Sequence, residues 1–249
     1  MLSKNQIKLI NNLQKKKFRY KNQLFVAEGV KVIKEFLKSK FELHALYTTA
    51  DIFIHSEQNS LFVTEAELKK ISNLTTPQTA LALFKIPENS PVYTAGISLA
   101  LDGIRDPGNL GTIIRQCDWF GIKQLICSTD TVDVYNPKVV QASMGSITRV
   151  EVIYTELEGF LSSDQRIKLG AFMDGESIYD TNYNTEDCIL VLGNEANGIR
   201  PSVEALISQK VSIPQYGKMK ETESLNVATA GAILMSEVRR KQALIIANK

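Results

Sequence analysis

Apolar residues follow two patterns along the chain, one in roughly the first third and another in the remainder. In the first third, "QLFVAEG" and "TALALFKI" predict strands, and "VKVIKEFLKSK" has the period of an amphipathic helix. "LFVTEAELKKIS" predicts a strand that runs into a helix, with Thr64 and Glu67 at capping-box spacing. Short strands and helices so closely spaced predict a small α/β domain over residues 1–88.

The two patterns are separated by "PENSPVYTAG", which holds two prolines, an asparagine and a serine. Proline and small polar residues of this kind interrupt regular structure. We therefore predict a linker over residues 89–96.

Beyond the linker, nearly continuous apolar segments alternate with segments of helical period. Strands are predicted at "ISLALDG", "KQLICST", "RVEVIY", "KLGAFMD", "CILVLG" and "KVSIP". Helices are predicted at 110–119, 137–146, 156–162, 201–208 and 225–244, two of them beginning at a proline, Pro137 and Pro201. This alternation predicts an α/β domain over residues 97–249, with a mostly parallel sheet and helices on both faces.

Few residues of the chain are suited to metal binding or disulfide formation. The cysteines, Cys117, Cys127 and Cys188, are far apart in sequence, and His44 and His55 have no neighbour at ligand spacing. We therefore expect no disulfide framework and no metal site. No apolar run approaches membrane-spanning length and "MLSKNQIKLI" lacks the core of a signal peptide, so we expect a cytoplasmic protein.

Charge is distributed unevenly, although the formal net charge is only +2. Residues 1–86 hold 14 Lys or Arg against 7 Asp or Glu, a balance of +7, and the remainder holds 15 against 20, a balance of −5. This asymmetry indicates that the first domain approaches a polyanion.

The most cationic stretch, "QKKKFRYKNQ", interleaves five cations with Phe18 and Tyr20. Cations bind phosphates, and aromatic rings stack on the bases of single-stranded RNA. For the two aromatic residues a place in the core below a solvated helix is an equally good interpretation. The predicted RNA-binding residues are Lys15, Lys16, Lys17, Arg19 and Lys21.

Ligands of open parallel α/β sheets bind beyond the carboxyl ends of the strands, where three unusual loops are predicted. In the first, "RDPGNLGTIIR", Pro107 and Gly108 suit a tight turn, and Asn109 can cap the next helix with its amide facing a cleft. Gly111 permits close approach, and Arg115 lies near the exposed start of the helix. A capped helix with a solvated arginine is the alternative.

The second and third loops also follow apolar strands. In "LVLGNEANGIRP", Glu195 stands within a polar turn, which could simply cap the next helix. In "VSIPQYGKMKETESLNVATAGAILMSEVRR", Ser224 and Asn226 are candidate caps of a helix with a face of small residues. That helix could equally form a dimer or domain interface. "GNLGTI" does not fit the dinucleotide fingerprint, and no phosphate loop of the Walker type is present.

Taken in order, the three loops resemble the motifs of the SpoU (TrmH-type) family of RNA ribose 2′-O-methyltransferases, in the knotted SPOUT class. The resemblance covers residues 97–240, and the front end resembles an RNA-binding domain similar to small α/β ribosomal proteins. The matching positions are Asn109, Gly111 and Arg115 in the first motif, Leu192, Gly193, Glu195 and Gly198 in the second, and Ile213, Pro214, Ser224, Leu225, Asn226 and Val227 in the third.

The resemblance implies a C-terminal trefoil knot, S-adenosylmethionine as cofactor, a homodimer, and methylation of a ribose 2′-hydroxyl in structured RNA, with 23S ribosomal RNA preferred. Because such a methyl donor already carries its activation, no metal is needed. The resemblance carries catalytic roles to Arg115, Asn109, Glu195, Ser224 and Asn226. It carries cofactor binding to Leu192, Gly193, Asn194, Gly198, Ile213, Pro214 and Leu225.

Arg115 is the residue on which the chemistry is expected to depend, with Asn109 positioning it. A free arginine is a poor base because its pKa exceeds about 12. Our hypothesis is that Arg115 binds the phosphate beside the target ribose and stabilises the developing alkoxide, while the proton leaves through that phosphate or a water molecule.

The chain departs from the family pattern at Gln215, at Trp119 and in the longer "GKMKET" before the third motif. Other functions also remain open at this point. They are methylation of transfer RNA, a catalytically silent RNA-binding assembly factor on the same scaffold, and a nicotinamide-dependent oxidoreductase, which the missing fingerprint disfavours.

Overall fold

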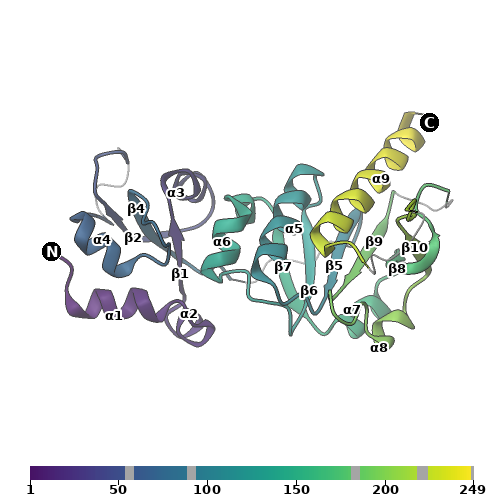
Figure 1. Cartoon of the computed structure of the whole chain (residues 1–249), viewed down its shortest axis with the longest axis horizontal. Helices are drawn as coiled ribbons and strands as arrows, with labels where there is room; N and C mark the ends of the chain where they lie inside the picture. Colours follow the sequence, from purple (N-terminus) through teal and green to yellow (C-terminus); the bar gives the residue numbers. More distant parts are fainter. Residues whose placement is uncertain (54–58, 89–93, 181–185, 218–223, 248–249) are drawn as a thin grey trace. The chain divides into compact units, whose positions relative to one another are not determined.

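The computed structural model describes residues 1–53, 59–88, 94–180, 186–217 and 224–247 (Figure 1). The chain divides into two compact units. The first consists of Met1–Asn89 together with Asp133–Thr148, and the second of Ser90–Val132 and Arg149–Lys249.

The first unit is built on a mixed four-stranded sheet with the order β1-β4-β2-β3. Strand β4 pairs antiparallel with β1 and β2, and β2 pairs parallel with β3. The predicted capping box of Thr64 and Glu67 is confirmed at the start of α4. The elements are α1 (Lys4–Asn12), α2 (Lys16–Asn22), β1 (Leu24–Glu28), α3 (Val30–Leu37), β2 (Leu43–Thr48), β3 (Ser60–Phe62), α4 (Glu65–Ile71) and β4 (Ala80–Lys85).

A second segment of the chain, Asp133–Thr148, completes the first unit with α6 (Pro137–Ser143) and a short 3-10 helix (Ser146–Thr148). The Tyr135 ring lies 4.7 Å from the Phe25 ring. The boundaries predicted from the sequence place this segment in the second domain, whereas its contacts group it with the first unit. The division into residues 1–88, 89–96 and 97–249 stays a prediction.

Arg19 is only 1 % exposed, which corrects its prediction as an RNA-binding residue. Its guanidinium donates to Oδ2 of Asp133 and to the carbonyls of Leu13 and Gln14, both at 2.8 Å. The hydroxyl of Tyr20 donates to the other oxygen of Asp133 at 3.0 Å. A buried cation needs such partners, so Arg19 serves the packing of this unit and is too buried to reach RNA.

The second unit contains a six-stranded sheet with the order β10-β8-β9-β5-β6-β7. All of its pairings are parallel, as the apolar strands predicted. The strands are β5 (Ile97–Asp102), β6 (Gln124–Ser128), β7 (Glu151–Thr155), β8 (Ile167–Ser177), β9 (Cys188–Gly193) and β10 (Gln209–Ser212). The helices are α5 (Pro107–Trp119), α7 (Leu157–Ser163), α8 (Pro201–Glu204) and α9 (Val227–Ala247).

Helices cover both faces of this sheet, as predicted (Figure 1). On one face, α5 and α9 lie side by side, joined by the Gln116 side chain, which donates to the Ala228 carbonyl at 2.9 Å. On this side Leu192 reaches Gly231, where an added Cβ would stand 3.0 Å from its Cδ1. On the other face, α7 and α8 pack on Ala100 and neighbouring strand residues. Both faces are therefore removed from water, which explains the continuous apolar strands.

Each of the five predicted helices has somewhat different bounds in the structure; α6, for example, ends at Ser143, and α9 spans Val227–Ala247. Helix α5 begins at Pro107 because Asp106 is its N-cap, and the Asp106 side chain accepts from the backbone amide of Asn109 at 2.8 Å. Pro107 and Gly108 therefore belong to its first turn, and Asn109 is not the cap. Helix α8 ends at Glu204, four residues earlier than predicted. The helix starts at Pro137 and Pro201 are confirmed.

Candidate active site

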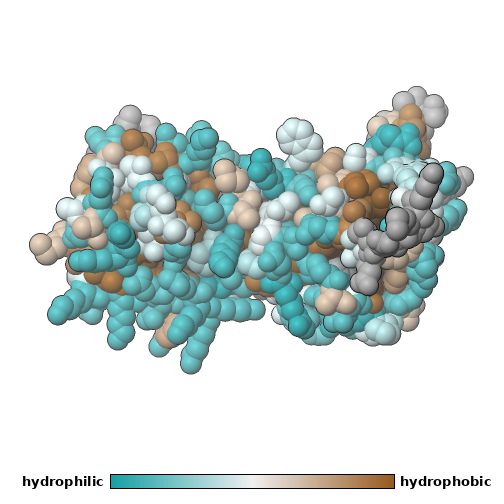
Figure 2. All heavy atoms as spheres, in the orientation of Figure 1, coloured by the Kyte–Doolittle hydropathy of each residue, from teal (hydrophilic) through white to brown (hydrophobic). Residues whose placement is uncertain are grey.

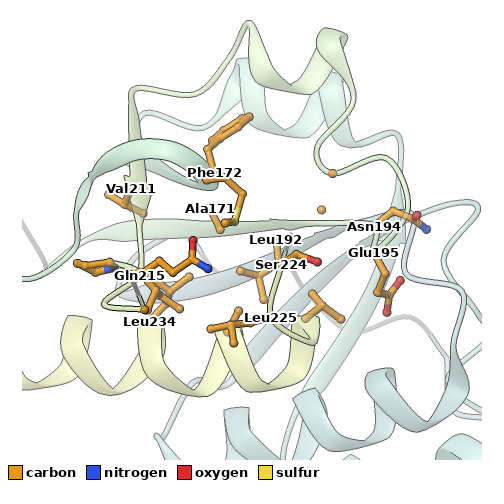
Figure 3. Close-up of a pocket in the computed structure, with 18 of the residues that line it drawn as sticks. Ala171, Phe172, Leu192, Asn194, Glu195, Val211, Gln215, Ser224, Leu225 and Leu234 are labelled. Atoms are coloured by element: carbon orange, nitrogen blue, oxygen red, sulfur yellow. The ribbon is translucent and has the colours of Figure 1, made fainter. Parts of the chain in front are cut away.

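A cavity of about 510 Å³ opens at the carboxyl edge of the parallel sheet (Figure 3). Its wall comes from β8, from the segments that follow β9 and β10, and from the start of α9. A volume of this size suits a nucleoside-sized ligand. Among the described residues, those of the second and third motifs that line it are Leu192, Gly193, Asn194, Glu195, Gly198, Ile213, Pro214, Ser224, Leu225 and Val227.

The loop after β9 folds back tightly on the strand that precedes it. Asn194 and Gly198 exchange backbone hydrogen bonds of 3.0 and 2.8 Å. This closure brings Gly198 and Ile199 so near Gly193 that an added Cβ would stand 2.2 Å from backbone atoms of both. Only glycine fits at position 193, so the loop geometry explains this residue of the second motif.

The three predicted loops meet at one point. The side-chain amide of Asn109, from the first loop, donates to Glu195 of the second. The amide of Asn226, from the third loop, donates to Oδ1 of Asn109 at 2.9 Å. Residues more than 80 positions apart in sequence are thus joined by hydrogen bonds.

The donors and acceptors of these hydrogen bonds follow from the cap of α9. Oδ1 of Asn226 accepts from the backbone amides of Ala228 and Thr229 at 3.0 and 3.2 Å, so Asn226 caps α9, as predicted. Its Nδ2 must then donate to Asn109, whose own Nδ2 in turn faces Glu195. The cap of α9 therefore sets Glu195 as a hydrogen-bond acceptor.

The loop between β5 and α5 is held from three sides. The Gly103 amide donates to Oγ of Ser128 at 2.8 Å, and the Gly103 carbonyl accepts from the Asn194 side chain at 2.6 Å. The Ile104 carbonyl accepts from the Val132 amide at 2.8 Å. The backbone of the first motif is thus fixed to the second motif and to the segment that follows β6.

Arg200 ties the end of the second loop to β5 and to the turn that follows β6. Its backbone amide and its Nε donate to the buried carboxylate of Asp102 at 2.8 and 2.6 Å, and its Nη2 reaches Asp130 at 2.9 Å. The hydrogen bond to Asp102 raises the pKa of Arg200 above its ordinary value, so the guanidinium stays charged. Sequence reasoning missed this pair because charged residues at two strand ends carry no pairing signal.

Arg115 lies on the exposed surface of α5 and makes no hydrogen bond or ion pair with any described residue. Both functional atoms of the Asn109 side chain are taken by Glu195 and Asn226. Asn109 therefore joins the three loops and makes no hydrogen bond to Arg115, and its role in positioning Arg115 stays a prediction. The Arg115 guanidinium is left available to a substrate.

Strand β8 contributes a wall of the cavity that the sequence did not predict. Ala171, Phe172 and Met173 line it, because β8 lies between β9 and β10 in the sheet. Figure 3 shows Phe172 and Ala171 opposite Gln215 and Leu234. Nothing in "KLGAFMD" distinguishes it from the other apolar strands, so no local signal could have placed it here. The "GKMKET" insertion, at 217–222, falls almost wholly outside the described residues.

The cysteines offer no nucleophile. Burial raises the pKa of Cys117 and Cys127 well above the ordinary thiol value, and that of Cys188 to about 12. All three therefore stay protonated at neutral pH. The described residues contain no group of histidine, cysteine or acidic side chains that could hold a metal ion. No helix within the described ranges is both long and apolar enough to cross a membrane.

Comparison with known proteins finds a matching family model for each of the two parts of the chain. The model of the SpoU rRNA Methylase family matches residues 96–236, and that of the MRM3-like substrate binding domain matches residues 4–82. The chain is 29% identical over 245 residues to the 23S rRNA (guanosine(2553)-2′-O)-methyltransferase RlmP of Bacillus subtilis, covering 95% of this chain and 97% of that protein.

Solved structures agree with this match. A putative RNA methyltransferase of the TrmH family from Porphyromonas gingivalis is 40% identical, with a TM-score of 0.88 over 97% of this chain and 99% of that one. An AdoMet-bound rRNA methyltransferase from Sinorhizobium meliloti is 27% identical, with a TM-score of 0.85 over 97% and 96%. The predicted family and fold are thereby confirmed, and the chain belongs to the SpoU family of rRNA methylases.

Proposed function

We propose that this protein transfers a methyl group from S-adenosylmethionine to a ribose 2′-hydroxyl of large-subunit ribosomal RNA. The observation that carries the proposal is the meeting of Asn109, Glu195 and Asn226 beside the cavity. The Bacillus subtilis relative methylates 23S rRNA at a 2′-oxygen, which favours ribosomal over transfer RNA. An RNA substrate agrees with the predicted cytoplasmic location, which stays a prediction.

The residues around the cavity fit the proposed cofactor. Leu192, Ile213 and Leu225 provide apolar surface for an adenine ring. Gly193 and Gly198 both line the cavity, and at Gly198 no atom lies within 4 Å of where a Cβ would stand, so a ligand can approach the backbone of the second loop there. Glu195 is the lining carboxylate among the described residues, and its negative charge favours a cationic ligand. The Sinorhizobium meliloti relative has AdoMet bound.

The cofactor, when bound, supplies an electrophilic methyl group on a sulfonium, so the protein's task is chiefly alignment. Asn109, Glu195 and Asn226 hold the three loops in register, while Ser224 lines the cavity next to Leu225. Arg115 binds the phosphate beside the target ribose and stabilises the alkoxide that forms as the hydroxyl proton passes to that phosphate or to a water molecule. Alignment of this kind contributes about 7–11 kcal/mol in favourable cases.

The proposal is tested with the wild-type chain and two separate measurements. Calorimetry is expected to detect S-adenosylmethionine binding, and incubation with an unmodified large-subunit rRNA transcript is expected to add a 2′-O-methyl group at one nucleotide. If the protein bound the cofactor and methylated transfer RNA but not this transcript, the substrate would be transfer RNA. Failure to bind the cofactor would leave only an RNA-binding role on this scaffold.

The RNA surface proposed for the first unit lies on α2 and the turn before it. Lys15, Lys16, Lys17 and Lys21 are exposed there, and Figure 2 shows hydrophilic side chains gathered along the side of this unit where α1 and α2 lie. Lys16 also stands 5.8 Å from the ring of Tyr20. The match of residues 4–82 to a substrate-binding domain supports this assignment.

Reversal of charge at Lys15, Lys16 and Lys17 to glutamate is expected to weaken RNA binding and flatten its dependence on salt. For each phosphate that is no longer neutralised, the negative slope of log K against log salt concentration becomes shallower by roughly 0.7–0.9. Affinity measured across a salt series checks this, with Lys85→Glu as control, since Lys85 already pairs with Glu42. An unchanged slope in the triple variant would remove this segment from the RNA surface.

We further propose that the protein is a homodimer through α5 and α9. Trp119 at the end of α5 is 85% exposed, and Leu225, just before α9, and Leu244, in its last turn, are about half exposed (47% and 51%). Large apolar side chains in such positions are typical of interfaces. Sedimentation equilibrium of the full chain measures the oligomeric state, and a monomer at micromolar concentration would contradict the proposal.

A further inference from the structure

The arginines of the chain divide into two groups by what their guanidinium groups bind. Six of the eight in the sequence donate to carboxylates or to carbonyl or amide oxygens. These are Arg19, Arg149, Arg166, Arg200, Arg239 and Arg240. The other two, Arg105 and Arg115, are exposed and make no hydrogen bond or ion pair with the described residues. Both belong to the first motif loop and the helix that follows it.

Arg105 differs from an ordinary surface arginine because its backbone is firmly held. Gly103 is fixed on both sides, by Ser128 and by Asn194, and the Ile104 carbonyl accepts from Val132. On the other side, Asp106 caps α5. Arg105 thus stands between anchored residues, and only its side chain is free to move.

The carboxylates nearest in sequence, Asp102 and Asp106, make no ion pair with Arg105. Asp102 and Asp130 are bound by Arg200, and Asp106 accepts from the Asn109 amide. The positive charge of Arg105 is therefore not neutralised by a described partner. An unpaired guanidinium presents a planar fork of donors that matches a phosphate group.

The loop that carries Arg105 belongs to the proposed active site. Gly103 is bonded to Asn194 of the cavity wall, and Asn109, four residues after Arg105, bonds to Glu195. Arg105 precedes α5 and Arg115 lies two turns into it, so the two free guanidinium groups come from either side of Asn109. An RNA strand whose ribose enters this site brings its own phosphates to the same edge of the sheet.

We infer that Arg105 binds a phosphate of the RNA strand next to the nucleotide that is methylated, as a second phosphate ligand in addition to Arg115. This inference rests on the proposed function for the identity of the strand. It assigns Arg105 to substrate binding and not to the chemical step. Arg105 also holds the strand in register, because its backbone is fixed to the loops that line the cavity.

The experiment compares wild type, Arg105→Ala and Arg105→Lys in binding to an unmodified large-subunit rRNA transcript over a range of salt concentrations. Removal of one phosphate-binding cation is expected to make the negative slope of log K against log salt concentration shallower by about 0.7. It is also expected to lower the affinity in 0.1 M salt by about fivefold. Arg105→Lys keeps the charge and is expected to keep the slope. Affinity for S-adenosylmethionine, measured by calorimetry, is expected to be unchanged and shows that the site is still folded.

Lys123→Ala is the matched control, because Lys123 is an exposed cation of the same unit that precedes β6, at the opposite edge of the sheet. An unchanged slope in Arg105→Ala overturns the inference, and so does an equal loss in Lys123→Ala, which would be an effect of net charge alone. Methyl transfer by the wild type is measured in a separate assay. Its absence would count against the proposed function, while the salt series still decides whether Arg105 binds RNA.

Discussion

Replacement of Arg115 by alanine is expected to lower methyl transfer by roughly a hundredfold to a thousandfold, with RNA affinity lowered only a few-fold. Removal of one donor to a developing oxyanion has an effect of about this size. Arg115 is exposed and free of described partners, so its replacement breaks no interaction of the fold. Single-turnover methylation of the rRNA transcript, with saturating S-adenosylmethionine, measures the rate.

Two further variants make this result specific. Arg115→Lys keeps the charge but loses the planar fork of donors, so an intermediate rate is expected. Arg149→Ala removes an arginine whose partner is the side chain of Asp118, and a rate near that of wild type is expected. Near wild-type turnover in Arg115→Ala, with RNA binding unchanged, would show that this residue has no role in the reaction.

Replacement of Asp133 by alanine is expected to lower the free energy of unfolding of the first unit by about 3–5 kcal/mol. The side chains of Arg19 and Asp133 are only 2% and 3% exposed, so Arg19 would be left as a buried cation without its carboxylate. The hydroxyl of Tyr20 would lose its acceptor as well. Urea denaturation followed by circular dichroism measures the change.

A surface pair and a double variant show whether burial is the cause. Asp118→Ala breaks the partly exposed pair with Arg149, and a loss of at most about 1 kcal/mol is expected. The double variant Arg19→Met with Asp133→Leu removes both charges and is expected to recover most of the stability lost in the single variant. If the double variant were as unstable as Asp133→Ala, the buried charge would not be the source of the loss.

Much of the proposed site could be predicted because its residues stand at strand ends. The strands "ISLAL", "CILVL" and "KVSI" are largely apolar, and the first polar residues after them are brought to one edge by a parallel sheet. The Asn226 cap is a local feature and was predicted from residue type alone. The trefoil knot is implied by membership of the SpoU family and has no signature in periodicity.

Other predictions failed where two local solutions compete. Asp106 and Asn109 are both good N-cap residues, and in the structure Asp106 is the cap. The side-chain amide of Asn109 is therefore free to bond to Glu195 and Asn226. Arg19 and its lysine neighbours have the same charge in the sequence, yet only Arg19 is buried. The difference arises from Asp133, which is 114 residues away.

The sequence by itself determined the kind of each main element, the alternation that makes the second sheet parallel, and the residue types at its carboxyl edge. These depend on hydrophobic period and on capping, which act over a few neighbouring residues. Only the tertiary structure decided that β8 forms a wall of the cavity, that residues 133–148 complete the first unit, and that Arg105 is free of described partners while Arg200 is paired. Those outcomes depend on strand order and on interactions between distant segments, and the free energy that selects them comes from packing and charge pairing that no local pattern encodes.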